Sequence, residues 1–322
     1  MGVVEAVVES DGDALIVRWT VEGGGSAAVD ISIGPGPEGL DHEHAMTVDG
    51  DAGTARIEGV GRGRHYVSVA PHEGGAALIV ADRRVPFDGV TNFRDLGGYV
   101  TTGGRRTRWG RVFRSDALHR FTEQDRTLYE SMGLRAVYDL RGEEERQRYP
   151  DPFPATWLAL LSGVTSLDEV PANAEAGERR LREMYIGMLA NAAPLLGQLI
   201  GGLANPDALP AVFHCTGGKD RTGISAAVLL ELLGVERQHV LDDYTLTSKY
   251  RLREHQEESY ANLLAAGLPP EAAAGVLGAP RWVMAETLDV LDADYGGAEA
   301  YLTGPAGVPE PAVRRLRELL VV

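Results

Sequence analysis

The chain has 322 residues and a formal net charge of −16, with 44% hydrophobic and 24% charged residues. This length favours two domains, and the composition is that of a globular protein. The acidic balance disfavours a nucleic-acid surface, which needs a stripe of cations. It still allows the binding of one phosphate group, because a pocket of backbone N–H groups can be locally positive on an acidic protein.

Membrane and export signals are not visible in the sequence. No apolar run is long enough to span a bilayer, and the acidic start "MGVVEAVVESDGD" lacks the cations of a secretory signal. The single cysteine, Cys215, excludes an internal disulfide and favours a reducing compartment. We therefore expect a cytoplasmic protein without stable membrane insertion, although secretion by another route stays open.

Residues 1–87 carry short apolar runs separated by Gly, Pro and Asp clusters. Several runs alternate with period two, as half-buried strands do. This pattern predicts a small all-β domain, and Trp19 and Tyr66 resemble the core aromatics of fibronectin type III or immunoglobulin-like sandwiches. We expect such a domain to recruit a protein partner. The runs are 14–21, 27–34, 54–60, 65–71 and 76–85.

Residues 88–322 alternate between helical and strand patterns instead. A helix is expected over 122–133, buried strands over 134–141 and 209–215, and an apolar helix directly after the second strand. Such alternation is typical of an α/β domain with a mainly parallel sheet flanked by helices.

The segment 145–179 lies between those two strands and has no steady period. Long irregular loops inside a compact domain are usually functional. A helical pattern follows over 179–203, with Pro194 placed to split it. We therefore expect a helical lid within 145–203.

The stretch "HCTGGKDRTG" (214–223) stands where the second strand gives way to the apolar helix. Gly217 and Gly218 let the backbone turn its N–H groups inward, and such groups at a helix N-terminus bind anions. The same field favours a thiolate at Cys215. Arg221 can close the loop and bind two phosphate oxygens with its planar fork. The stretch therefore predicts a phosphate cradle with a nucleophile at its base.

The remaining residues of the loop have expected roles as well. His214 is placed to orient the loop through backbone hydrogen bonds, and Thr222 to donate a hydrogen bond to the sulfur. Thr216, Lys219 and Asp220 complete the loop around the substrate phosphate together with the two glycines.

The stretch fits the H-C-x5-R-[ST] signature of the protein tyrosine phosphatase superfamily. "TNFRDLGGY" (91–99) and "VFRSDAL" (112–118) further resemble its bacterial branch, which includes enzymes that act on both phosphotyrosine and phosphoinositides. The resemblance implies a phosphatase-type α/β fold, a phosphocysteine intermediate, and phosphotyrosine proteins or phosphoinositides as substrates, with phosphoserine and phosphothreonine as further candidates. It implies neither a metal nor a cofactor.

The general acid that protonates the leaving group has two candidates. The family comparison points to Asp139, because parallel strands place their carboxyl ends at one sheet edge and Asp139 would then lie beside Cys215. Asp220, inside the loop, is the alternative. We favour Asp139. Lys219 suits a substrate with more than one phosphate, which predicts phosphoinositide hydrolysis.

Other charged residues are expected to support the site rather than to act on substrate. Arg94 and Asp95 are interpreted as a buried pair that fixes loops, and Arg114 with Asp116 as an ion pair near the pocket. Arg141 is expected to orient Asp139 or to form a salt bridge, and residues 142–148 to form a solvated helix face. The alternative function is a phosphate-binding pseudophosphatase or partner-recruiting module, against which Cys215 and Arg221 argue.

Overall fold

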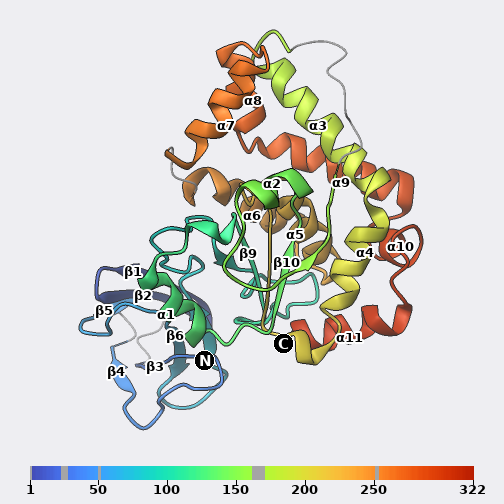
Figure 1. Cartoon of the computed structure of the whole chain (residues 1–322). Coiled ribbons are helices and arrows are strands. Elements are labelled where there is room, and N and C mark those ends of the chain that lie inside the picture. The colour runs from blue at the N-terminus through green and yellow to red at the C-terminus, as the bar shows by residue number, and fades with distance from the viewer. Residues whose placement is uncertain (1, 23–27, 50–51, 162–170, 251–253) are drawn as a thin grey trace. The chain divides into compact units, whose positions relative to one another are not determined.

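The computed structural model describes residues 2–22, 28–49, 52–161, 171–250 and 254–322. The chain divides into two compact units (Figure 1). The first holds residues 1–87 with 126–132, and the second holds 88–125 with 133–322. Residues 126–132, which the sequence pattern assigned to the second domain, therefore belong to the first unit.

The first unit is built from two antiparallel sheets. Val17 and Trp19 of one sheet share a buried cluster with Ile31, Val67 and Val69 of the other, which gives the unit a sandwich-like core. One sheet has the order β1-β2-β5 and the other β4-β3-β6-β7. Their strands are β1 (Val3–Asp11), β2 (Ala14–Val21), β3 (Val29–Gly34), β4 (Met46–Val48), β5 (Thr54–Ile57), β6 (Tyr66–Pro71) and β7 (Leu78–Ala81).

The second unit contains one sheet of order β11-β10-β12-β9-β8, in which only β8 runs antiparallel to its neighbour. The register sets Ser115, Asp139 and His214 level with one another at the carboxyl ends of three parallel strands. This confirms the mainly parallel α/β sheet and places Asp139 at the same edge as the cysteine. The strands are β8 (Arg94–Asp95), β9 (Val112–Ser115), β10 (Ala136–Asp139), β11 (Thr156–Trp157) and β12 (Ala211–His214).

Helices and strands of this unit share one large buried cluster. Helix α5 is apolar on nearly all sides, as a helix in the middle of a domain must be, and ten of its thirteen residues are buried. Helix α1 (Glu123–Ser131) begins in the second unit and continues into the first. The other helices of the second unit are α2 (Glu143–Arg148), α3 (Ala174–Asn191), α4 (Ala193–Gly202), α5 (Asp220–Leu232), α6 (Arg237–Tyr250), α7 (Glu254–Ala265), α8 (Pro270–Leu277), α9 (Arg281–Tyr295), α10 (Ala298–Thr303) and α11 (Glu310–Leu320).

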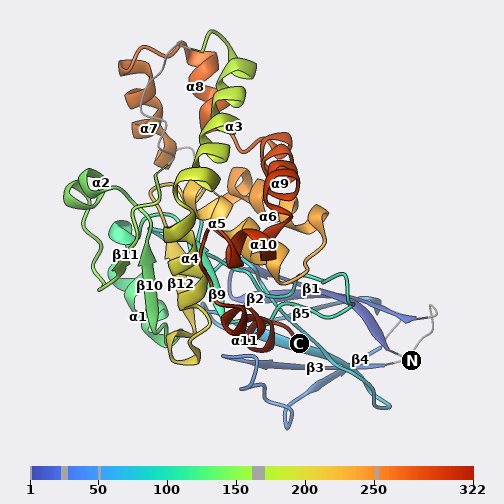
Figure 2. The ribbon, with the colours of Figure 1, turned by 90° about the vertical axis from the view of Figure 1, so that its right-hand side faces the viewer.

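Helices α7 and α8 and the first half of α3 form a helical group that stands away from the sheet (Figures 1 and 2). Helices α3 and α8 approach closely through glycines: a Cβ on Gly177 would lie 2.4 Å from the carbonyl oxygen of Ala272, and one on Gly275 would lie 2.3 Å from that of Ala174. The expected lid range of 145–203 thus includes only one member of this group, and its residues 162–170 lie outside the described part of the chain.

Within the described residues, no single helix has the length and apolarity needed to cross a membrane. The pair α3 and α4 meets that test together, by length and composition only, and is bent by 73° at its break. The break precedes Pro194, where the sequence predicted a split.

Candidate active site

The cysteine loop occupies residues 215–219, between the last residue of β12 and the first residue of α5. Cys215 is buried, with 1% of its surface exposed. Because β9, β10 and β12 all end at this edge, the loop is surrounded by the segments that follow the three strands.

Gly218 is required by the loop's shape. Its φ of +63° is left-handed, and a Cβ there would lie 2.6 Å from the carbonyl oxygen of Ser115. The carbonyl of Gly218 accepts hydrogen bonds from Asn92 at 3.2 Å and Arg114 at 2.8 Å, and Asn92 also donates to the carbonyl of Gly217 at 3.1 Å. Since the C=O and N–H of a trans peptide point in opposite directions, the N–H groups of Gly218 and Lys219 face the other side of the loop. The two upstream motifs therefore orient the loop's donors.

Asp243 on α6 joins the arginines of both upstream motifs and was missed by the sequence analysis. It is buried, pairs with Arg94 at 3.2 Å and with Arg114, and accepts a hydrogen bond from Tyr99 at 2.9 Å. The expected Arg94–Asp95 and Arg114–Asp116 pairs are replaced by these contacts. Neighbouring residues in a strand point to opposite faces, so Arg94 and Asp95 cannot pair.

Asp95 and Asp116 instead bind backbone N–H groups. Asp95 accepts hydrogen bonds from Gly97 and Gly110, both at 2.8 Å, and Asp116 accepts one from Asn92 at 3.0 Å. Both carboxylates therefore shape the segments around the cysteine loop.

Arg221 is held by Glu145 of α2, a second residue that the sequence analysis missed. The two Nη atoms of Arg221 donate to the two carboxylate oxygens at 2.5 and 2.8 Å, and the hydroxyl of Thr216 donates to the same carboxylate. Burial acts to raise the pKa of Glu145, but the hydrogen bonds from Arg221 and Thr216 outweigh it and lower the pKa to about 2. Glu145 is therefore an anion at any physiological pH.

A hydrogen bond from the start of α2 fixes the direction of the Glu145 side chain. Its Oε2 accepts the N–H of Gly142 at 2.8 Å, which satisfies a donor that the first turn leaves open. The expectation that 142–148 forms only a solvated face is thus wrong at Glu145. The spacing between Gly142 and Glu145 is a helix-start pattern, and this was the available signal in the sequence.

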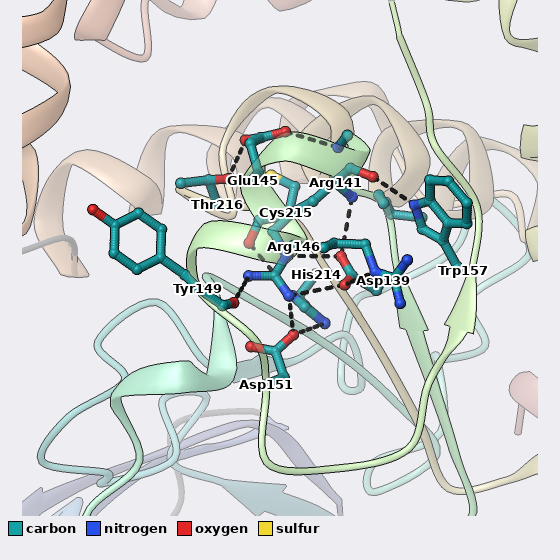
Figure 3. A network of polar contacts seen from close by, with 12 residues as sticks. Asp139, Arg141, Glu145, Arg146, Tyr149, Asp151, Trp157, His214, Cys215 and Thr216 are labelled. Carbon is teal, nitrogen blue, oxygen red and sulfur yellow. Dashed lines mark hydrogen bonds and ion pairs between the residues drawn. The ribbon is translucent and has the colours of Figure 1, made fainter.

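Asp139 and Arg141 lie in a buried network beneath the loop (Figure 3). Arg141 donates to both oxygens of Asp139 at 2.9 and 2.8 Å, and also to Asp151, whose carboxylate lies 3.4 Å from Nε2 of His214. Burial acts to raise the pKa of Asp139, but hydrogen bonds from Arg141 and nearby positive charge lower it overall. Arg141 therefore orients Asp139, as the sequence suggested.

Burial shifts the pKa values of Asp151 and His214 in opposite directions, because it disfavours the charged form of each side chain. Burial raises the pKa of Asp151 to about 6 and lowers the pKa of His214 to about 4. Asp139, Asp151 and His214 offer ligand atoms within 4.8 Å of one another, which is a spacing that a metal ion could use. However, the guanidinium of Arg141 already donates to both carboxylates, so the two carboxylates are occupied by the arginine rather than by a metal ion.

The other polar residues in and beside the cysteine loop bind groups of the protein itself, with one exception. Asp220 accepts a hydrogen bond from Tyr185 at 2.8 Å, and His214 Nδ1 lies 3.4 Å from the carbonyl of Cys215. The Thr222 hydroxyl is buried without a hydrogen-bond partner among the described residues, so the expected bond to the sulfur is not formed in this conformation. The ammonium of Lys219 is bound to two carbonyls of the α8 end.

Comparison with known proteins fits this geometry. Residues 85–322 match the model of the "Tyrosine phosphatase family". A protein of Cupriavidus necator, whose name assigns it provisionally to the tyrosine-protein phosphatases, is 29% identical over 73% of this chain and 88% of its own length. The triple specificity protein phosphatase PtpB of Mycobacterium tuberculosis is 28% identical, over 75% of this chain and 100% of its own. Among solved structures, the core catalytic domain of the PP-IP phosphatase SIW14 from S. cerevisiae shares 17% identity over 52% of this chain and 94% of its own, with a TM-score of 0.26.

Proposed function

Because the chain belongs to the tyrosine phosphatase family, we propose that it hydrolyses phosphotyrosine monoesters through a phosphocysteine at Cys215. The observation that carries the proposal is the loop itself. Asn92 and Arg114 bind its carbonyls from one side, and Arg221 is fixed at its far end by Glu145. An oxyanion facing the opposite side would meet backbone donors and a guanidinium.

The proposed reaction has two displacements. The thiolate of Cys215 attacks phosphorus, an S–P bond forms, and the P–O bond to the leaving group breaks with its electron pair on oxygen, which takes a proton. Water then attacks phosphorus and loses a proton, the S–P bond breaks, and inorganic phosphate leaves with the thiolate restored.

Arg221 can serve this reaction while bound to Glu145. A guanidinium has five N–H donors, and the Glu145 carboxylate takes one from each Nη. The N–H of Nε and the second N–H of an Nη atom do not point at Glu145. These donors can bind two phosphate oxygens. Glu145 acts in this proposal as a positioning residue for the guanidinium.

We assign the general acid to Asp220 rather than to Asp139. Both oxygens of Asp139 are bound by Arg141, one of them also by Arg146 at 3.2 Å, and its side chain is only 3% exposed, so neither oxygen is available to a leaving group. Asp220 is the first residue of α5, lies between Lys219 and Arg221, and has a side chain 32% exposed. It protonates the leaving oxygen in the first step and takes the proton of water in the second.

The acid assignment predicts different leaving-group dependences for two matched variants. Asp220→Asn should lose about 10²–10⁴-fold in kcat with phenyl phosphate and much less with an activated aryl phosphate, because a good leaving group needs no proton. The measurement is kcat for the two substrates across pH.

Asp139→Asn is the control for this test. Its effect on kcat should be equal for the two substrates. Because the folded pKa of Asp139 is lowered, its carboxylate stabilises the protein above the unfolded pKa of about 4, and this contribution disappears as the pH falls. A leaving-group dependence confined to Asp139→Asn would return the acid role to Asp139.

The substrate class is tested by phosphate release from a panel. The name of the PtpB relative records triple specificity, so the panel contains phosphotyrosine, phosphoserine and phosphothreonine peptides and a phosphoinositide in vesicles. We expect phosphotyrosine peptides to be the best substrates, with the other classes measurable but slower. Phosphate release at background level for every class would contradict the proposed hydrolysis and favour a phosphate-binding module without turnover.

A further inference from the structure

Lys219 is a buried cation inside the cysteine loop, with 2% of its surface exposed. Its Nζ donates to the carbonyl of Val276 at 2.6 Å and to that of Gly278 at 2.7 Å, and lies 3.2 Å from a carboxylate oxygen of Asp220. An ammonium group has three N–H donors, and these three oxygens match them. A buried charge is tolerated only when it is bonded in this way.

The two carbonyl acceptors belong to the end of α8. The helix ends at Leu277, so the carbonyls of Val276 and Gly278 lie where intrahelical partners run out. This end also carries the negative pole of the helix dipole, which favours a cation. Lys219 therefore caps the C-terminal end of α8 from within the cysteine loop.

The end of α8 also borders a cavity among the described residues. A cavity of about 410 Å³ lies among α6, α7 and α8, and Gly278 forms part of its wall. Packing on that side therefore contributes less than it would in a close-packed core. The bonds to Lys219 and the close contact of Gly275 with Ala174 of α3 therefore hold the end of α8 together.

Helix α7 packs against α8 and also contacts residues beside the cysteine loop. Glu258 on α7 accepts a hydrogen bond from Tyr149 at 2.5 Å and pairs with Arg148 at 3.2 Å. Glu258 and Ser259 also line a small cavity together with Thr216 of the cysteine loop. Any movement of the α7–α8 pair would therefore change the surroundings of the loop.

We propose that Lys219 is a positioning residue that ties the C-terminal end of α8 to the cysteine loop and so fixes the α7–α8 pair beside the substrate entrance. The entrance is that of the proposed phosphatase site, on which this part of the inference rests. In this role the ammonium does not bind a second phosphate of the substrate. The assignment replaces the expectation that Lys219 selects substrates with more than one phosphate.

Hydrogen–deuterium exchange tests whether the hydrogen bonds of Lys219 hold the end of α8, and it does so without an activity measurement. Lys219→Met keeps the length of the side chain and removes its donors, and we expect amides of 270–279 to exchange at least about tenfold faster. The matched control is Lys249→Met, because Lys249 is the only other lysine of the chain and is exposed on α6. Unchanged exchange over 270–279 in Lys219→Met would overturn the proposal.

Kinetics separate positioning from direct recognition. If Lys219 acts as a positioning residue, Lys219→Met lowers kcat/KM by the same factor for a small aryl monophosphate and for an aryl bisphosphate. A loss at least about tenfold greater for the bisphosphate would show a direct phosphate contact and contradict the proposal. If neither substrate is hydrolysed by the wild-type protein, the proposed function fails, and the exchange result still decides whether the tie exists.

The wild-type protein offers a further measurement in case Lys219→Met does not fold. An amine-reactive reagent should label Lys219 at least about tenfold more slowly than Lys249, as read by mass spectrometry of the two peptides. Equal labelling rates would contradict the buried, fully bonded ammonium.

Discussion

Replacing Cys215 by serine should reduce kcat for an aryl phosphate by at least about 10⁴-fold, since Cys215 is the proposed nucleophile and the hydroxyl of Thr216 and the ammonium of Lys219 are bound to other groups. A serine hydroxyl is nearly the same size as the thiol but is not ionised at neutral pH. The loop donors and Arg221 would remain in place, so the variant should still bind phosphate or vanadate. The measurement is steady-state phosphate release with the wild-type protein beside it.

Binding supplies the control for this prediction. Thermal unfolding of Cys215→Ser should respond to added phosphate, because a ligand that binds only the folded state raises its stability. A variant that keeps activity within tenfold of the wild type would contradict the nucleophile assignment. A variant that neither turns over nor responds to phosphate would instead locate the damage in the loop's shape.

Replacing Arg221 by lysine should lower kcat by about 10²–10³-fold, the loss typical of removing one donor to a developing oxyanion. Lysine keeps the positive charge but loses the planar fork, so it cannot bind Glu145 with two donors and a phosphate with two others. Phosphate affinity should fall as well, which separates this variant from Cys215→Ser. Both quantities are measured by kinetics and by phosphate titration.

Glu145→Gln is the matched control for Arg221→Lys. It keeps the guanidinium and the approximate shape of its partner but weakens two charge-assisted hydrogen bonds at 2.5 and 2.8 Å. We expect this change to reduce transition-state stabilisation by about 1.5 kcal/mol, which lowers kcat/KM roughly tenfold. Equal losses in the two variants would mean that the charge of Glu145, rather than the fork of Arg221, is what the reaction needs.

Most of the fold could be predicted because its signals are local. Runs of alternating apolar and polar residues predicted the strands of the first unit. The run 209–215 predicted a buried strand that ends at the cysteine, and the structure has this strand over Ala211–His214. Pro194 predicted the break between α3 and α4 because it cannot continue a helix without loss of a hydrogen bond. The grouping of α3 with α7 and α8 was not visible, since it depends on close approach at Gly177 and Gly275, which are far apart in sequence.

The cysteine loop of the candidate site could be predicted from the sequence, but the residues from other segments that bind it could not. Spacing alone brings Cys215, Gly218 and Arg221 together, because all three lie within one strand–helix turn. Asp243 and Glu145 reach the site from distant segments, and a carboxylate on a helix gives no sequence sign of which arginine it will meet. The same reason explains Lys219, whose position in the loop suggested a phosphate contact while its partners lie at the end of α8.

The central claim is that the sulfur of Cys215 carries the phosphoryl group between the two displacements. It is tested most directly by mixing excess protein with an activated aryl phosphate, quenching in acid at successive times within one turnover, and mapping phosphorylated peptides by mass spectrometry. The account predicts one phosphoryl group on the peptide that contains Cys215, rising and then falling as phosphate is released. Release of phosphate while that peptide stays unmodified at every time, or a phosphoryl group on another residue, would contradict it.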